Sequence, residues 1–188
     1  MKYNNLIKLC LVLAAILLIS SALPAAAEGP ASEVASMISG VHQLKDENSD
    51  VRLQISSLSG VGSSVNLLVT GSGTYQGKEV RQQGVIQLAS EGPDVRVTII
   101  PHFAPVTELS PDVNRFSEAE LRAACSVYLE RDEGKWVGAT QGPGTCVQAV
   151  TGAAGQWQVE VLRGALRFVD VGTKQALVFQ KTGDAASR

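Results

Sequence analysis

The chain has 188 residues, of which 45% are hydrophobic and 18% are charged, and this balance fits one globular domain with a full apolar core. Its formal net charge is −2 and its basic residues do not cluster, which argues against a surface for binding nucleic acid. The two histidines show no metal-ligand spacing, so the sequence predicts no metal site.

Residues 1–27 have the features of a secretory signal peptide. Lys2 and Lys8 give a charged start, an apolar run follows, and three alanines end at Ala27. We expect cleavage after Ala27, which also removes Cys10 and leaves 14 basic and 18 acidic residues, a net charge of −4. The mature protein is then periplasmic or secreted and has no transmembrane span. An uncleaved membrane anchor is the alternative, although the apolar run is short for a span of about 20 residues.

The mature chain is expected to begin with a short helix over residues 33–39, with Ser32 as its N-cap and Gly40 after its end. Alternating apolar and polar residues then predict short strands separated by turns. A capping box of Ser117 and Glu120 predicts a second short helix, which follows a proline-rich loop. The strands are expected over 51–56, 65–75, 79–88, 95–99, 125–131, 135–140, 156–162, 166–171 and 175–180.

Eight or nine strands with only two small helices predict an all-β fold, an antiparallel calycin- or lipocalin-like β-barrel. Residues 28–182 form this single barrel domain, and 183–188 form a frayed tail. Gly71 and Gly73 fall inside a predicted strand, where glycine often marks the bend at which a sheet curls into a barrel. An antiparallel sandwich is the alternative. A barrel of about eight strands either fills its interior with side chains or holds one small ligand.

Two cysteines remain after signal cleavage. A hairpin that folds about Glu133 places the residue opposite Cys125 near Gln141 or Gly142, and the next turn brings Cys146 back toward the same rim. Because export permits disulfides, we expect Cys125 and Cys146 to form one, worth about 3 kcal/mol. Two free buried thiols are the alternative.

Polar or amphipathic side chains within strands are the candidate ligand contacts at the mouth of a barrel: Arg81, Tyr75 and Asp170. The alternative is a solvated outer face for Arg81 and Asp170, and packing in the barrel wall for Tyr75. His42 and His102 are expected at the surface or rim. The sequence lacks a Gly-x-Ser-x-Gly elbow and a phosphate-binding loop, so hydrolysis and phosphoryl transfer have little support.

Several segments, taken in order, form a pattern typical of one protein family: Arg81-Gln82, Val85-Ile86-Gln87-Leu88, 116–121, 125–131, Gly138, Cys146, 157–162, Asp170 and 177–181. In these segments the chain resembles the CpcT/CpeT-type phycobiliprotein (chromophore) lyases. The resemblance covers about residues 75–182, and the two cysteines anchor it best. It implies a calycin-like barrel that holds an open-chain tetrapyrrole (a bilin) and helps attach it to a cysteine of a light-harvesting protein.

The chromophore lyases act in the cytoplasm, whereas this chain carries an export signal. We therefore expect an exported, divergent member that kept the barrel. The first hypothesis is a carrier or chaperone for a tetrapyrrole-like or other elongated apolar molecule. The second is a true bilin lyase, and the third is a structural envelope protein without a ligand.

Overall fold

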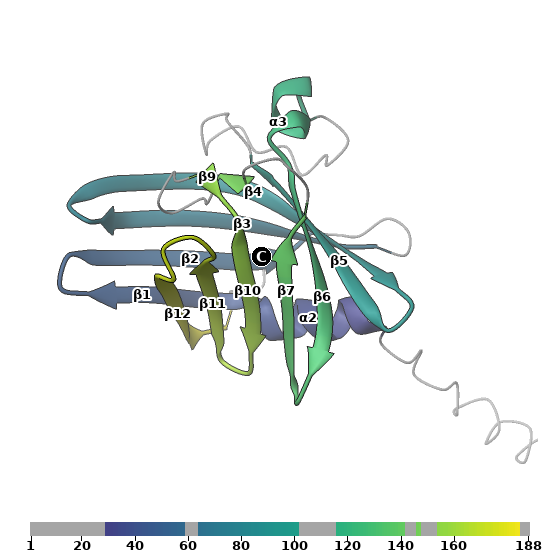
Figure 1. Cartoon of the computed structure of the whole chain (residues 1–188). Helices are drawn as coiled ribbons and strands as arrows, with labels where there is room; N and C mark the ends of the chain where they lie inside the picture. Colours follow the sequence, from purple (N-terminus) through teal and green to yellow (C-terminus); the bar gives the residue numbers. More distant parts are fainter. Residues whose placement is uncertain (1–28, 59–63, 102–115, 142–145, 148–153, 185–188) are drawn as a thin grey trace, which may run out of the picture.

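The computed structural model describes residues 29–58, 64–101, 116–141, 146–147 and 154–184. These residues form an all-β fold, a closed antiparallel barrel of ten strands with two short helices (Figure 1). The predicted calycin-like barrel is therefore confirmed. The predicted signal peptide, loop 59–63 and His102 lie outside the described residues.

Strand order around the barrel is β1-β12-β11-β10-β7-β6-β5-β4-β3-β2, and every neighbouring pair is antiparallel. Five of the neighbouring pairs are joined by two-residue turns, and the pairing of β1 with β12 closes the ring. A separate two-stranded sheet pairs β8 (Cys146–Val147) with β9 (Ala154–Gly155). The barrel strands are β1 (Gly40–Asp46), β2 (Ser49–Ser57), β3 (Ser64–Tyr75), β4 (Lys78–Glu91), β5 (Asp94–Pro101), β6 (Cys125–Asp132), β7 (Lys135–Thr140), β10 (Trp157–Leu162), β11 (Ala165–Asp170) and β12 (Ala176–Gly183).

Helix α2 (Pro30–Ile38) crosses one end of the barrel. It contacts β3, β4 and β5 as well as β10, and β10 lies opposite β3 in the ring of ten (Figure 1). A helix that touches opposite walls must pass over the end of the barrel. The buried side of α2 belongs to the same apolar core as the inner faces of the strands, and it consists of Ala31, Val34, Ala35 and Ile38.

Two polar contacts hold this helix against the wall. The amide of Ala31 donates to the hydroxyl of Ser90 at 3.1 Å. The carboxylate of Glu33 forms an ion pair with Arg131, whose guanidinium also lies 5.4 Å from the centre of the Trp136 ring. The end of the barrel near α2 is therefore sealed by apolar packing with a polar rim.

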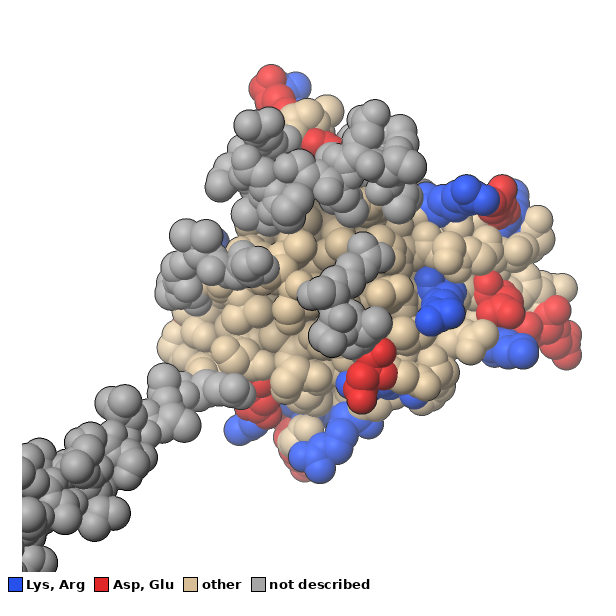
Figure 2. Space-filling model, turned by 180° about the vertical axis from the view of Figure 1, so that it is seen from behind, with Lys and Arg blue, Asp and Glu red and all other residues tan. Residues whose placement is uncertain are grey.

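Alternation along most strands separates an inner from an outer face, although β4 buries four residues in a row, 83–86. Val51, Leu53 and Ile55 are buried in the core, as their alternation with polar residues predicts. Seen from behind, charged side chains of both signs gather mainly at the margins of the molecule (Figure 2). The described residues on this face therefore provide no field of one sign to steer a charged partner.

Two inner-face glycines show why the sheet can curl. Gly73 has φ +137°, and a Cβ on it would lie 2.0 Å from the carbonyl oxygen of Asp50. A Cβ on Gly138 would lie 1.9 Å from the carbonyl oxygen of Tyr128. The absence of a side chain lets neighbouring backbones approach closely at these bends, as predicted for Gly73.

The β1–β2 and β3–β4 hairpins extend beyond the closed ring, toward the left of Figure 1. β4 pairs with β3 from Lys78 onward, whereas its described pairing with β5 begins at Gly84. The β3–β4 turn has positive φ at Gln76 and Gly77, which is the geometry of a type I′ hairpin turn. This extension lies at the end of the barrel opposite α2.

The second helix, α3 (Glu118–Arg122), projects at this opposite end (Figure 1). Its capping box is confirmed: the hydroxyl of Ser117 accepts from the Glu120 amide, and the Glu120 carboxylate accepts from the Ser117 amide at 2.7 Å.

Several predicted boundaries were wrong. Helix α2 begins at Pro30 with Gly29 as N-cap, because proline's fixed φ and missing N–H suit the first helical position. The strand Gly40–Asp46 was not predicted. The described residues contain twelve strands rather than eight or nine, and the last one runs through Gly183, into the segment predicted to fray.

Candidate functional site

Tyr75 ends β3 on the inner face of the projecting hairpin. It is half-buried and packs against the apolar core. Burial raises the pKa of its phenol, and the nearby carboxylate of Asp46 adds to this effect. Its hydroxyl also accepts a long hydrogen bond from the side-chain amide of Gln76 at 3.4 Å. Tyr75 therefore fits the predicted role in wall packing and also presents a hydroxyl near the hairpin tip.

Arg81 lies on the outer face of β4, because it alternates with the inward-facing Val80 and Gln82. Its side chain is 78% exposed, and its guanidinium forms an ion pair of 2.7 Å with Glu79 on the same strand. This position corresponds to the solvated outer face considered above for Arg81. An outward-facing residue cannot contact a ligand inside the barrel.

Asp170 ends β11 on the inner face and pairs across the strand with Trp157. Its Oδ1 accepts the amide of Thr173 at 2.7 Å, and its carbonyl accepts the amide of Lys174 at 2.9 Å. The Thr173 amide is the main cause that holds the pKa of Asp170 below its usual value, so this carboxyl is ionised at neutral pH. Asp170 therefore shapes the β11–β12 turn.

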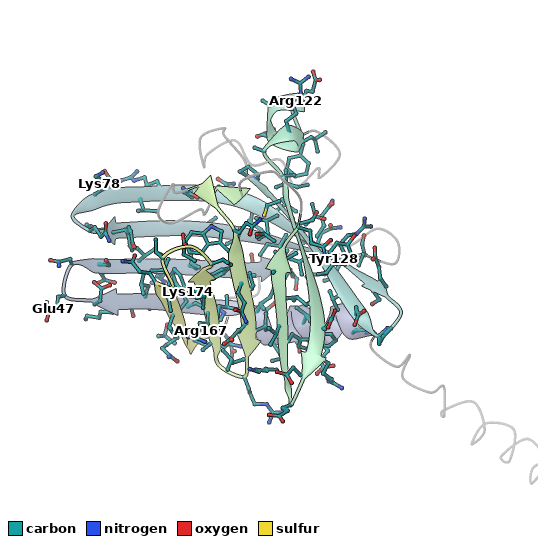
Figure 3. The ribbon with its side chains drawn as sticks, viewed as in Figure 1. Glu47, Lys78, Arg122, Tyr128, Arg167 and Lys174 are labelled. Carbon is teal, nitrogen blue, oxygen red and sulfur yellow. The ribbon has the colours of Figure 1, made fainter. Side chains whose placement is uncertain are left out.

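The three predicted contacts do not form one cluster. Tyr75 and Arg81 belong to the β3–β4 hairpin, whose tip is marked by Lys78, whereas Asp170 begins the turn marked by Lys174 (Figure 3). All three residues lie toward the end of the barrel opposite α2.

The structure adds Trp157 and Gly155 to the surroundings of Asp170. Trp157 is only 6% exposed, and its indole Nε1 is buried without a hydrogen-bond partner. Gly155, on β9, lies beside both side chains: a Cβ built on it would be 3.5 Å from Asp170 Oδ2 and 3.6 Å from Trp157 Nε1. We call Gly155, Trp157 and Asp170 the mouth group. The unpartnered N–H of Trp157 has no signal in the sequence.

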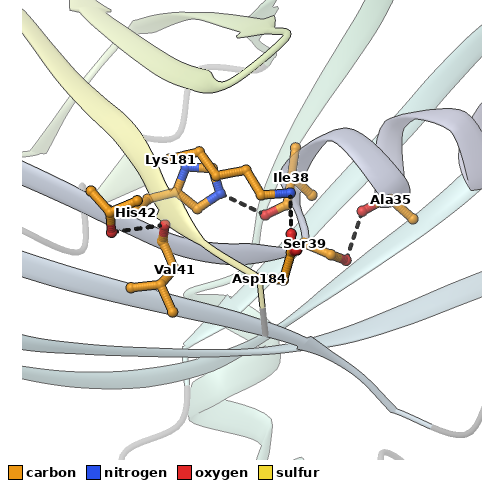
Figure 4. Close-up of polar contacts among 8 residues, drawn as sticks. Ala35, Ile38, Ser39, Val41, His42, Lys181 and Asp184 are labelled. Atoms are coloured by element: carbon orange, nitrogen blue, oxygen red, sulfur yellow. Dashed lines mark hydrogen bonds and ion pairs between the residues drawn. The ribbon is translucent and has the colours of Figure 1, made fainter. Parts of the chain in front are cut away.

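A second polar group lies inside the barrel near α2. His42 is fully buried, which corrects its predicted place at the surface or rim. Its Nε2 is 2.9 Å from the carbonyl oxygen of Ile38, and its Nδ1 has no hydrogen-bond partner (Figure 4). Burial is the largest cause that lowers the pKa of this imidazole, and the charge of Lys181 lowers it further. The indole Nε1 of Trp136, at the same end, is likewise buried without a partner.

The hairpin that follows Cys125 has the predicted form. Val127 pairs with Thr140, and the amide of Gln141 donates to the carbonyl of Ser126, so the register leads from Cys125 toward residues 141–142 as expected. Cys125 has an interaction partner. The side chain of Cys146 lies outside the described residues, so the pairing of the two cysteines stays a prediction.

Comparisons with known proteins found no matching family model, curated protein or solved structure. The helices among the described residues are all too short or too polar to cross a membrane. Within that same part of the chain, no three His, Cys, Asp or Glu side chains lie together as a metal-ion site would require.

Proposed function

We propose that this protein is an exported β-barrel that binds a small, elongated and largely apolar molecule and serves as its carrier or chaperone. The observation that carries the proposal is the inner face of the barrel. It is apolar, yet it holds buried donors or acceptors without partners in Trp136, Trp157 and His42. Ligand sites in proteins are mostly apolar with a few converging polar groups.

The number of strands supports this proposal. An eight-stranded barrel is just wide enough for side chains to fill it or for one small ligand, and barrel diameter grows with strand number. This barrel has ten strands. Helix α2 crosses one end, while the mouth group and Tyr75 lie at the other, so a ligand would enter from the end opposite α2.

A ligand panel tests the proposal. The purified mature protein would be mixed with biliverdin, haem, long-chain alcohols, amides and fatty acids. Pigment binding would be followed by a shift in the pigment's absorbance, and binding of the others by tryptophan fluorescence. Saturable binding of at least one class supports the carrier. No binding across the panel favours a structural envelope protein whose interior holds no ligand.

A chromophore lyase is the second candidate, supported by the resemblance and by the inward position of Asp170, which the resemblance includes. Arg81 lies outside the barrel, so in a lyase it would contact the acceptor protein rather than the bilin. Asp170→Asn and Arg81→Ala would then reduce bilin transfer to an acceptor at different steps, binding for the first and docking for the second. Unchanged transfer by both variants would count against this function.

Export and a Cys125–Cys146 disulfide are part of the same proposal. Amino-terminal sequencing of protein from the periplasm or medium would find Glu28 as the first residue. A chain that keeps Met1 would show that the leader remains as an anchor.

A further inference from the structure

Resting on the proposed function, we propose that the mouth group binds a neutral head group that both accepts and donates a hydrogen bond, such as a hydroxyl or an amide, and discriminates against a carboxylate. The mouth group consists of Gly155 on β9, Trp157 on β10 and Asp170 on β11. The proposal concerns the chemistry of the ligand's polar end, whereas the rest of the ligand lies against the apolar inner face.

The first requirement comes from Trp157. An indole nitrogen can only donate, and Nε1 of Trp157 is buried with no acceptor in hydrogen-bond range. A buried donor that stays unpaired costs about 1–3 kcal/mol. A bound ligand that presents an oxygen to this N–H removes the cost, so the head group must accept a hydrogen bond.

The second requirement comes from Asp170. Its Oδ1 is occupied by the amide of Thr173, while Oδ2 faces Gly155. An ionised carboxylate only accepts hydrogen bonds, so a group that meets Oδ2 must donate one. A ligand carboxylate cannot donate and would meet a like charge there.

The third requirement comes from Gly155. A Cβ on Gly155 would lie 3.5 Å from Asp170 Oδ2 and 3.6 Å from Trp157 Nε1, so both polar groups flank this glycine. A head group that meets both groups must stand farther from the Gly155 Cα than a Cβ would, because an unbonded atom cannot approach to bonding distance. A side chain at this position would stand between the head group and its two complementary partners, and glycine has none.

Three probes with ten carbons each test the inference: decanol, decanamide and decanoate, titrated into the mature protein at neutral pH and followed by calorimetry. We expect decanol and decanamide to bind on the order of tenfold more tightly than decanoate. Equal affinities for all three would overturn the inference and leave the carrier function standing. Absence of binding by all three and by the wider panel would overturn both.

Two variants and a control assign the effect to the mouth group. Asp170→Asn keeps an oxygen for the Thr173 amide and replaces the charge with an N–H donor, so the preference against decanoate should disappear. Trp157→Phe keeps an apolar ring but removes the N–H, so binding of decanol should weaken on the order of tenfold. Glu130→Gln, at an exposed carboxylate on the outer face of β6, should leave the order of affinities unchanged. A preference that survives in both Asp170→Asn and Trp157→Phe, with circular dichroism showing intact folds, would contradict the assignment.

Discussion

The imidazole Nε2 of His42 lies 2.9 Å from the carbonyl oxygen of Ile38, so the first barrel strand is hydrogen-bonded to the last residue of the helix that crosses the barrel end. A carbonyl only accepts, so Nε2 carries the proton of a neutral ring. Lys181 lies near the imidazole and is itself paired with Asp184 at 3.3 Å (Figure 4). A second proton on His42 would place a positive charge in a buried site, close to the positive charge of Lys181.

Stability should therefore fall as the pH drops below about 6.5, the ordinary pKa of histidine. Burial lowers the pKa of His42 in the folded state, so between the two pKa values the unfolded chain binds the extra proton and folding is disfavoured. His42 alone can change the free energy of unfolding by at most about 1.4 kcal/mol per pH unit. Urea unfolding between pH 7.5 and pH 5.5 would measure it.

His42→Gln should flatten this dependence, while His102→Gln provides the matched control and should keep it. If the wild-type protein and His42→Gln lose stability in parallel over this range, carboxylates rather than His42 set the response.

Apolar burial, more than the ion pair of Glu33 with Arg131, should hold α2 in place. Ile38 is only 4% exposed, and Ile38→Ala should lower the free energy of unfolding by about 2–5 kcal/mol. Glu33 and Arg131 are both solvent-exposed at 40% and 58%, so Glu33→Gln should cost no more than about 1 kcal/mol. Chemical denaturation of both variants would compare the two losses of stability. A larger loss for Glu33→Gln than for Ile38→Ala would show that the ion pair, rather than apolar burial, holds α2 in place.

Gly138→Ala should be strongly destabilising, because the new Cβ would lie 1.9 Å from the Tyr128 carbonyl oxygen and neither backbone can move without breaking strand pairing. Crowding of this kind costs about 1–3 kcal/mol and sometimes more. Gly183→Ala is the control, since a Cβ there meets nothing within 4 Å. Equal melting temperatures for the two variants would show that the β6–β7 bend does not depend on glycine.

Oxidised mature protein should contain no free thiol, and replacing both cysteines by serine should lower its stability by about 3 kcal/mol. Thiol titration under denaturing conditions and urea unfolding provide the two measurements. Two reactive thiols per chain in freshly exported protein would contradict the Cys125–Cys146 pairing.

Most of the architecture could be predicted because local signals agree with it. Val51, Leu53 and Ile55 alternate with polar residues, and Ser117 and Glu120 form their capping box as expected. The strand Gly40–Asp46 escaped prediction for a physical reason: its inward positions are Gly40, His42, Leu44 and Asp46, of which one is aliphatic. In this strand a buried histidine takes an inward position that an apolar residue fills in other strands, so the apolar alternation is missing.

The candidate site was less predictable, because it depends on which face each polar residue occupies. Arg81 and Asp170 both lie in strands, yet the register places Arg81 outside and Asp170 inside. The strand around Arg81 has apolar residues at both Val85 and Ile86, so its alternation is ambiguous in sequence. Gly155 on β9 comes close to Trp157 and Asp170 only when the chain is folded. No spacing in the sequence indicates this contact.

Native mass spectrometry of the exported mature protein is the most direct test of the carrier function. We expect one small molecule bound per chain, either retained from the cell envelope or acquired by the stripped protein from the ligand panel, and lost on denaturation. A protein that shows only its unliganded mass under every one of these conditions would contradict the account.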